Sequence, residues 1–201
     1  MSRAFSFVAA AVVGLALAGP AWAQEPRQPG PHAPRQVGAN LSGYSLNINQ
    51  PGTTGVQGFV VLEAETTLGR ALATGTNGAF GPPSPSGPYP EWCPQQLPLV
   101  VFKPMVTGGD IGLRFRSSGD LLLVKGVPDA TAGLGLCIHK NADLTGGWYE
   151  GRGAGTIVSG TGRFEGVTGV FESRYGGRFY TATFSDTLSI FEQTLRIHID
   201  R

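Results

Sequence analysis

Short apolar runs separated by glycine-rich turns limit the fold of this chain more than any other feature. Apolar Phe191, Leu195, Ile197 and Ile199 alternate with polar Glu192, Thr194, Arg196, His198 and Asp200 at a period of two, and residues 111–116 follow the same pattern. This pattern is typical of a strand with one face in the core and the other in water. Glycine supplies 31 of the 201 residues, about twice its usual share. Because helical periodicity is almost absent, we predict an all-β, antiparallel barrel or sandwich.

Further runs with strand character follow one another along the chain, separated by turns rich in Gly, Pro, Asn and Asp. With the two runs described above, the predicted strands lie at residues 44–48, 59–65, 99–102, 111–116, 121–124, 134–140, 148–158, 170–175, 179–184 and 191–199. Three glycines at alternate positions of the 148–158 run share one face, which lets a large group pack close to the backbone. Residues 68–74 are ambiguous and have the best chance of a helical turn, and Gly176-Gly177 is predicted to be a turn. The runs are too short and uneven, and lack the aromatic girdles, for a membrane barrel.

The first 23 residues have the organisation of a secretory signal peptide. Arg3 gives a positive start, residues 7–18 are apolar, and Ala21-Trp22-Ala23 is a small-x-small cleavage site. The apolar run is too short for a spanning helix, which needs about 20 residues, and no cysteine follows the cleavage site to carry a lipid anchor. We therefore expect a periplasmic or secreted protein that begins at Gln24 and has no membrane span.

After the signal peptide, residues 24–40 contain four prolines and no apolar periodicity. We expect a disordered leader there, followed by a single domain over residues 41–201. Removing Arg3 with the signal peptide leaves 14 basic residues against 14 acidic ones. A neutral chain lacks the electrostatic footprint with which proteins bind nucleic acid or anionic lipid, so we expect no nucleic-acid partner.

The two cysteines, Cys93 and Cys137, are an even count in a chain that is predicted to be exported. In that context we predict a disulfide between them, and closing so long a loop would stabilise the fold by about 4 kcal/mol on the chain-entropy model. The alternative is two buried free thiols.

A proline-rich segment at residues 78–96 interrupts the strand pattern and contains two large rings, Tyr89 and Trp92. A loop this long in a compact domain is usually functional or disordered, and a disulfide at Cys93 would hold it down. Two arrangements stay open for the rings. They cover the mouth of a barrel and contact a ligand, or they pack on the outside of the sheet.

A glycine-rich segment reads Ser-Gly-Thr-Gly-Arg-Phe-Glu-Gly-Val-Thr-Gly from Ser159 to Gly169. It resembles a signature of the allene oxide cyclase and dirigent superfamily, which is close to Gly-Gly-Thr-Gly-Arg-Phe-Ala-Gly-Ala-Thr-Gly. Ser159, Glu165 and Val167 depart from that pattern. The resemblance implies a closed, eight-stranded, lipocalin-like barrel that can hold a small apolar ligand, and family members often form homo-oligomers. It carries over no catalytic position, because the family's ligand-handling residues lie outside the matched segment.

The same segment has a physical interpretation of its own. Gly160 and Gly162 permit positive φ angles for a sharp exit from a strand, Phe164 can plug the barrel end as an apolar stopper, and Gly166 and Gly169 let the backbone pass close to its neighbours. A phosphate-binding loop is excluded, because strand-like residues follow where such a loop needs a helix. The segment is predicted to be structural and not catalytic.

The sequence shows no convergent catalytic or metal-binding set. Of the three histidines, only His139 has a potential ligand close by, and that ligand is Cys137. A disulfide would remove its thiolate, so we expect no metal. No Gly-x-Ser-x-Gly elbow occurs, and we expect no cofactor. The best carboxylate candidates are Glu150 and Glu172, which either form cross-strand ion pairs on the outside or line a polar interior.

We therefore expect an exported β-barrel protein without catalytic activity, which binds a small apolar molecule or has a structural role in the cell envelope. The alternative is a cyclase-like or dirigent-like isomerase acting on an apolar or phenolic substrate, with Glu150 or Glu172 as a buried acid or base. The ligand-binding candidates are Tyr89, Trp92, Glu150 and Glu172.

Overall fold

The structure, a computed structural model, describes residues 35–49, 56–82, 89–94, 96–128, 133–181 and 187–200. The strands are β1 (Gln36–Asn49), β2 (Val56–Thr66), β3 (Gly69–Phe80), β4 (Val100–Thr107), β5 (Asp110–Phe115), β6 (Leu121–Gly126), β7 (Gly135–Lys140), β8 (Gly147–Gly160), β9 (Thr168–Phe179) and β10 (Thr187–Asp200), with one short 3₁₀ turn, η1 (Gly162–Phe164). The predicted signal peptide lies outside the described residues.

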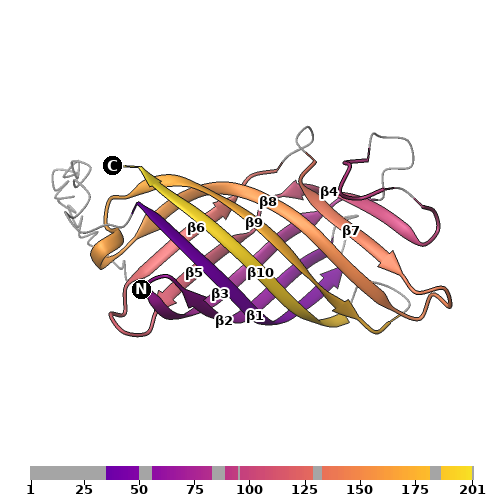
Figure 1. Ribbon diagram of the computed structural model, residues 1–201, viewed down its shortest axis with the longest axis horizontal. Coiled ribbons are helices and arrows are strands. Elements are labelled where there is room, and N and C mark those ends of the chain that lie inside the picture. Colours follow the sequence, from indigo (N-terminus) through magenta and orange to yellow (C-terminus); the bar gives the residue numbers. More distant parts are fainter. Residues whose placement is uncertain are drawn as a thin grey trace, which may run out of the picture.

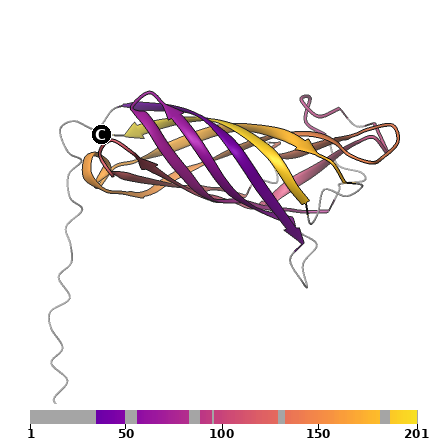
Figure 2. The ribbon, with the colours of Figure 1, turned by 90° about the horizontal axis from the view of Figure 1, so that it is seen from below.

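All ten strands form one antiparallel sheet, which confirms the predicted all-β class (Figure 1). The order of pairing is β2-β1-β10-β9-β8-β6-β5-β3, and β3 pairs in turn with β2. Neighbouring strands far apart in the sequence, such as β1 and β10, run side by side along the long axis of the molecule (Figure 2). β1, β8 and β10 have 14 residues each, so these strands are longer than predicted.

The two remaining strands, β4 and β7, extend the sheet at one end. β3 pairs with β5 over Ala71–Gly75 and then with β4 at Ala79 and Phe80. β8 divides in the same way, because its first half pairs with β7 and its second half with β6. The β4–β7 pair and the β5–β6 pair thus fill the space between β3 and β8 at opposite ends. The chain crosses between them where a Cβ on Gly108 would collide with the carbonyl of Gly126, so only glycine permits the crossing.

The interior is filled by large side chains from every strand of the ring. Phe115, Phe164, Phe179 and Phe191 are among its fully buried residues. The glycine face predicted in β8 points inward, where a Cβ on Gly151 would collide with the ring of Tyr175. Alternate small and large residues therefore let a bulky core fit between close backbones.

The glycine-rich segment at residues 159–169 closes this core at the β8–β9 connection. Phe164 is fully buried, and its ring centroid lies 5.0 Å from that of Phe115, so its predicted inward packing is confirmed. Gly162 and Gly166 have φ angles of 59° and 72°, as a sharp exit requires. Gly160 is needed for a different reason from the predicted one, because it has no positive φ and its Cβ would instead collide with Phe164.

Three boundaries differ from the sequence predictions. Residues 68–74 form no helical turn, since Leu68 lies in the turn between β2 and β3 and every β3 position from Gly69 to Thr74 pairs with β2. Gly176 and Gly177 lie inside β9 and are not a turn, because their pairing with β8 and β10 is unbroken. β1 begins at Gln36, within the segment predicted to be a disordered leader, and its pairing with β10 there explains why.

Candidate functional site

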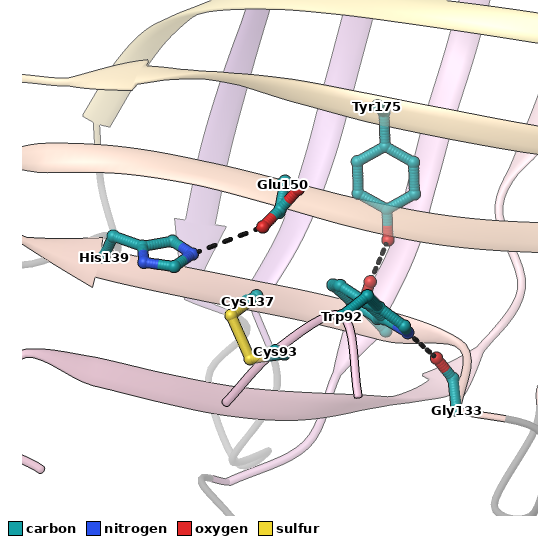
Figure 3. The surroundings of a disulfide bond; sticks show 8 residues. Trp92, Cys93, Gly133, Cys137, His139, Glu150 and Tyr175 are labelled. Carbon is teal, nitrogen blue, oxygen red and sulfur yellow. Dashed lines mark hydrogen bonds and ion pairs between the residues drawn. A yellow bond between two sulfur atoms is a disulfide. The ribbon is translucent and has the colours of Figure 1, made fainter. Parts of the chain in front are cut away.

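Residues 89–94 of the proline-rich segment pack on the outer side of β4 and β7. Tyr89 and Trp92 lie against Phe102 of β4, with ring centroids 5.9 Å and 5.8 Å away. The indole Nε1 of Trp92 donates a 3.1 Å hydrogen bond to the carbonyl oxygen of Gly133 (Figure 3). Of the two arrangements left open by the sequence, these contacts are those of rings packed outside the sheet, where they form a small hydrophobic cluster of their own.

The predicted disulfide between Cys93 and Cys137 is present and joins this loop to β7 (Figure 3). Both cysteines are fully buried. The bond therefore fixes the loop to the sheet within the same small hydrophobic cluster in which Trp92 packs.

Beside the disulfide, His139 of β7 and Glu150 of β8 face each other (Figure 3). The His139 Nε2 to Glu150 Oε1 distance is 3.5 Å, which is too long for a strong hydrogen bond. The His139 ring stacks in parallel on Trp148, with centroids 3.6 Å apart. Burial lowers the pKa of His139, and the Glu150 carboxylate only partly offsets that shift, so the imidazole is held neutral.

These residues do not form a metal site in the oxidised protein. Ligand atoms of Cys137, His139 and Glu150 lie within 4.8 Å of one another. However, the Cys137 sulfur is bonded to Cys93 and offers no thiolate. Two remaining ligands are fewer than a structural or catalytic zinc site needs.

The two candidate carboxylates lie on the outer face of the sheet. Glu150 is 44% exposed in its side chain, and Glu172 of β9 is exposed as well. Neither lines a polar interior. Glu172 borders a hollow of about 440 Å³ together with Arg152, Arg174 and Arg196, so its surroundings are cationic and open to solvent.

A larger hollow of about 870 Å³ lies on the outer face across β8, β9, β10 and β1. Gly176 and Gly177 of β9 form its floor, and Arg174 and Arg178 flank them along the strand. Its walls also include Trp148, Ile190, Glu192, Glu65, Asn40, Ser42 and Thr194. A hollow forms here because Gly176, which faces outward, has no side chain, whereas its cross-strand neighbours Glu150 and Glu192 have long ones.

Sequence reasoning missed this hollow because it treated Gly176-Gly177 as a turn. A signal was present, since Phe171, Tyr175 and Phe179 keep one parity across the two glycines and all three are buried. A continuous period of two over residues 168–179 predicts one long strand with a bare outward position.

Inside the ring, a cavity of only about 30 Å³ lies between Gln193, Ser173 and Tyr175. That space holds about one water molecule. The Oε1 atom of Gln193 is buried, and no protein group described in the structure hydrogen-bonds to it. Tyr175 donates a 2.9 Å hydrogen bond to the Gly135 carbonyl, and burial raises the pKa of its phenol.

No known protein-family model, curated protein or solved structure matches this chain. Among the described residues, no helix is long and apolar enough to cross a membrane.

Proposed function

We propose that the eight-strand ring is a closed barrel and that the protein is exported. The pairing of β2 with β3, which completes the cycle of strands, supports closure, as does the resemblance of residues 159–169 to the allene oxide cyclase and dirigent signature. The charged, apolar and small-residue organisation of residues 1–23 supports export to the periplasm or beyond.

The barrel's function, we infer, is to bind a small, largely apolar molecule on its outer face without chemical turnover. The observation that carries this proposal is the contrast in size between the cavity of about 30 Å³ beside Gln193 and the outer hollow of about 870 Å³. Ligand pockets usually have volumes of roughly 300–1,000 Å³. Trp148 and Ile190 supply apolar contact in the hollow, while Arg174 and Arg178 can pair with a polar or anionic end of the ligand.

A retention experiment tests this proposal. The purified, oxidised protein is incubated with a lipophilic metabolite extract, separated from unbound compounds, and its retained ligands are identified by mass spectrometry. Ser42→Trp places a large ring in the hollow and should abolish retention. Thr156→Trp makes the same kind of change at an exposed position of β8 outside the hollow, and should leave retention unchanged. No retained compound, or equal retention by both variants, would contradict the site.

The cyclase-like alternative has one observation in its favour. His139 and Glu150 form a neutral imidazole–carboxylate pair beside the Trp148 ring, and Trp148 borders the hollow. Such a pair can accept and return a proton at an apolar substrate. If candidate substrates are converted, Glu150→Gln and His139→Gln should each abolish turnover while leaving ligand retention intact. Turnover that survives both changes would remove this alternative.

A further inference from the structure

One end of the sheet carries a broad apolar surface on its outer side. It consists of large residues on β2, β1 and β10 that are between 37% and 62% exposed, and we call it the apolar belt: Phe59, Val61, Tyr44, Leu46, Ile48, Leu188 and Ile190. The three strands pair directly (Figure 2).

The belt is continuous across the strands. Val61, Tyr44 and Ile190 stand in one cross-strand row, and Phe59, Leu46 and Leu188 stand in the next. The first row continues through Arg178 of β9 to Trp148 of β8, and Tyr180, just after β9, is also exposed. Exposed apolar patches of several hundred Å² usually mark a site of interaction.

Behind the belt, the inner face of β1 and β10 is polar, while β2 contributes the buried Val60. Ser45, Asn47 and Ser189 are buried and hydrogen-bonded to one another, with Asn47 Nδ2 donating to Ser189 Oγ at 3.3 Å and Ser45 Oγ donating to Asn47 Oδ1 at 3.1 Å. The Tyr149 hydroxyl lies 3.1 Å from Ser189 Oγ. On β1 and β10, the usual arrangement, apolar inside and polar outside, is therefore reversed at this end.

The reversal follows from the length of β1. Val37, Ala39 and Leu41 are buried in the core, and the pairing of β1 with both neighbours runs without a bulge to Asn47. Since side chains alternate strictly along a strand, Ser45 and Asn47 must also point inward. Tyr44 and Leu46 then have no place except the outside.

Charge changes sharply at the edge of the belt. The next row along the strands carries Glu63, Glu192 and Glu150, about 7 Å farther along the strands, which is two residues. Within the two belt rows, from β2 to β8, Arg178 is the one charged residue among those the structure describes. The Arg178 guanidinium at the border complements the phosphates of a lipid headgroup layer, and the carboxylates of the next row lie farther out, on the water side of that layer. Trp148, beside Arg178, has the amphipathic ring that favours this layer.

We propose that the belt end of the protein docks into one leaflet of a phospholipid bilayer, with the belt among the upper acyl chains and Arg178 at the phosphates. The two belt rows and Ile48 span about four residues of β1, or roughly 14 Å along a tilted strand, which suits the usual interfacial depth of about 5–10 Å. The surface curves over β2, β1, β10 and the ends of β9 and β8. A fluid bilayer can follow this curvature, whereas a second rigid copy of the protein would contact only part of the surface. The neutral overall charge is no obstacle, because apolar burial drives the binding. Trp148, Arg178 and Ile190 belong both to this surface and to the ligand hollow, whereas Leu46 lies outside the hollow. Leu46→Glu therefore separates the two proposals, because it should reduce docking and leave ligand retention unchanged.

Flotation with vesicles of phosphatidylcholine and a minority of phosphatidylglycerol tests the docking. The purified, oxidised protein should float with the vesicles. Leu46→Glu and Ile190→Glu should each reduce the bound fraction about tenfold or more, because each buries a carboxylate among acyl chains. Val158→Glu is the matched control at an exposed apolar position of β8 that lies outside both the belt and the hollow, and it should bind like the parent protein. Circular dichroism and urea midpoints should be unchanged in all three, since these side chains are exposed.

Three results would overturn the proposal. The first is equal flotation of the belt variants and the control, and the second is no flotation of the parent protein. The third is a stable dimer, seen by sedimentation without vesicles, that both belt variants dissociate, because the belt would then bind a second copy. Arg178→Gln supplies a further measurement, since it should weaken binding only to vesicles that contain phosphatidylglycerol and only at low salt.

Discussion

Truncation of Phe164 is the sharpest test of how the core is closed. The ring is fully buried and packs against Phe115, and the Arg163 guanidinium lies 5.8 Å from its centroid. Phe→Ala changes at such sites cost about 3–5 kcal/mol, through lost burial and the cavity left behind. Because the backbone here is fixed by a tight turn between two long strands, the site has little freedom to collapse, and we expect the upper half of that range.

Urea unfolding of the oxidised protein, followed by circular dichroism, measures this loss. With an m-value of about 2 kcal/mol/M for a domain of this size, Phe164→Ala should lower the midpoint by about 2 M. Val170→Ala is the control, since Val170 is 51% exposed on the outer face of β9, and it should change the stability by no more than about 0.5 kcal/mol.

The pair with Phe115 provides a second check on the same contact. The losses for Phe164→Ala and Phe115→Ala should not add, because each change enlarges the same cavity, and the coupling should be about 0.5–3 kcal/mol. A loss below about 1 kcal/mol for Phe164→Ala, or strict additivity of the two, would show that the ring does not pack in the core as described.

Three further predictions concern the disulfide and two titrating side chains. Replacing Cys93 and Cys137 by Ser should lower the unfolding free energy by about 4 kcal/mol, because the bond closes a loop across 44 residues of separation; a urea midpoint close to that of the oxidised parent would contradict this. Burial lowers the pKa of His139, so the unfolded chain takes up its proton more readily and stability should fall as the pH drops below about 6.5. His139→Gln should remove that part of the pH dependence between pH 7 and pH 5, and parallel curves for variant and parent would refute it. The Arg163 guanidinium holds the pKa of Asp120 below its usual value, so Asp120→Asn should cost about 1 kcal/mol at pH 7 for this partly exposed pair. That difference should vanish as the pH falls below about 4, and a constant difference would argue against the ion pair.

The outer hollow shows where local patterns stop being informative. Trp148 and Ile190 come from strands that are distant in the sequence, and only the register of β8, β9 and β10 brings them together. A Gly-Gly pair frequently forms a turn. At Gly176-Gly177 the chain stays extended instead, because both residues pair with β8 on one side and with β10 on the other. The disulfide that holds the loop of Tyr89 and Trp92 was predicted correctly, but no periodicity in a proline-rich loop specifies which side of a sheet it covers.

The sequence by itself determined the all-β class, most strand positions, the disulfide, and the inward packing of Phe164, because alternation, glycine and cysteine content act locally or through composition. The tertiary structure alone decided which face of β1 is inside. Residues 44–48 show the reason most clearly, since taken alone they would place Tyr44 and Leu46 in a core. At the other end of β1, Val37, Ala39 and Leu41 are buried in the core. The strict alternation along the strand then places the side chains of Tyr44 and Leu46 outside and those of Ser45 and Asn47 inside. A period of two assigns residues to opposite faces, and only the packing of the whole strand assigns one of those faces to the core.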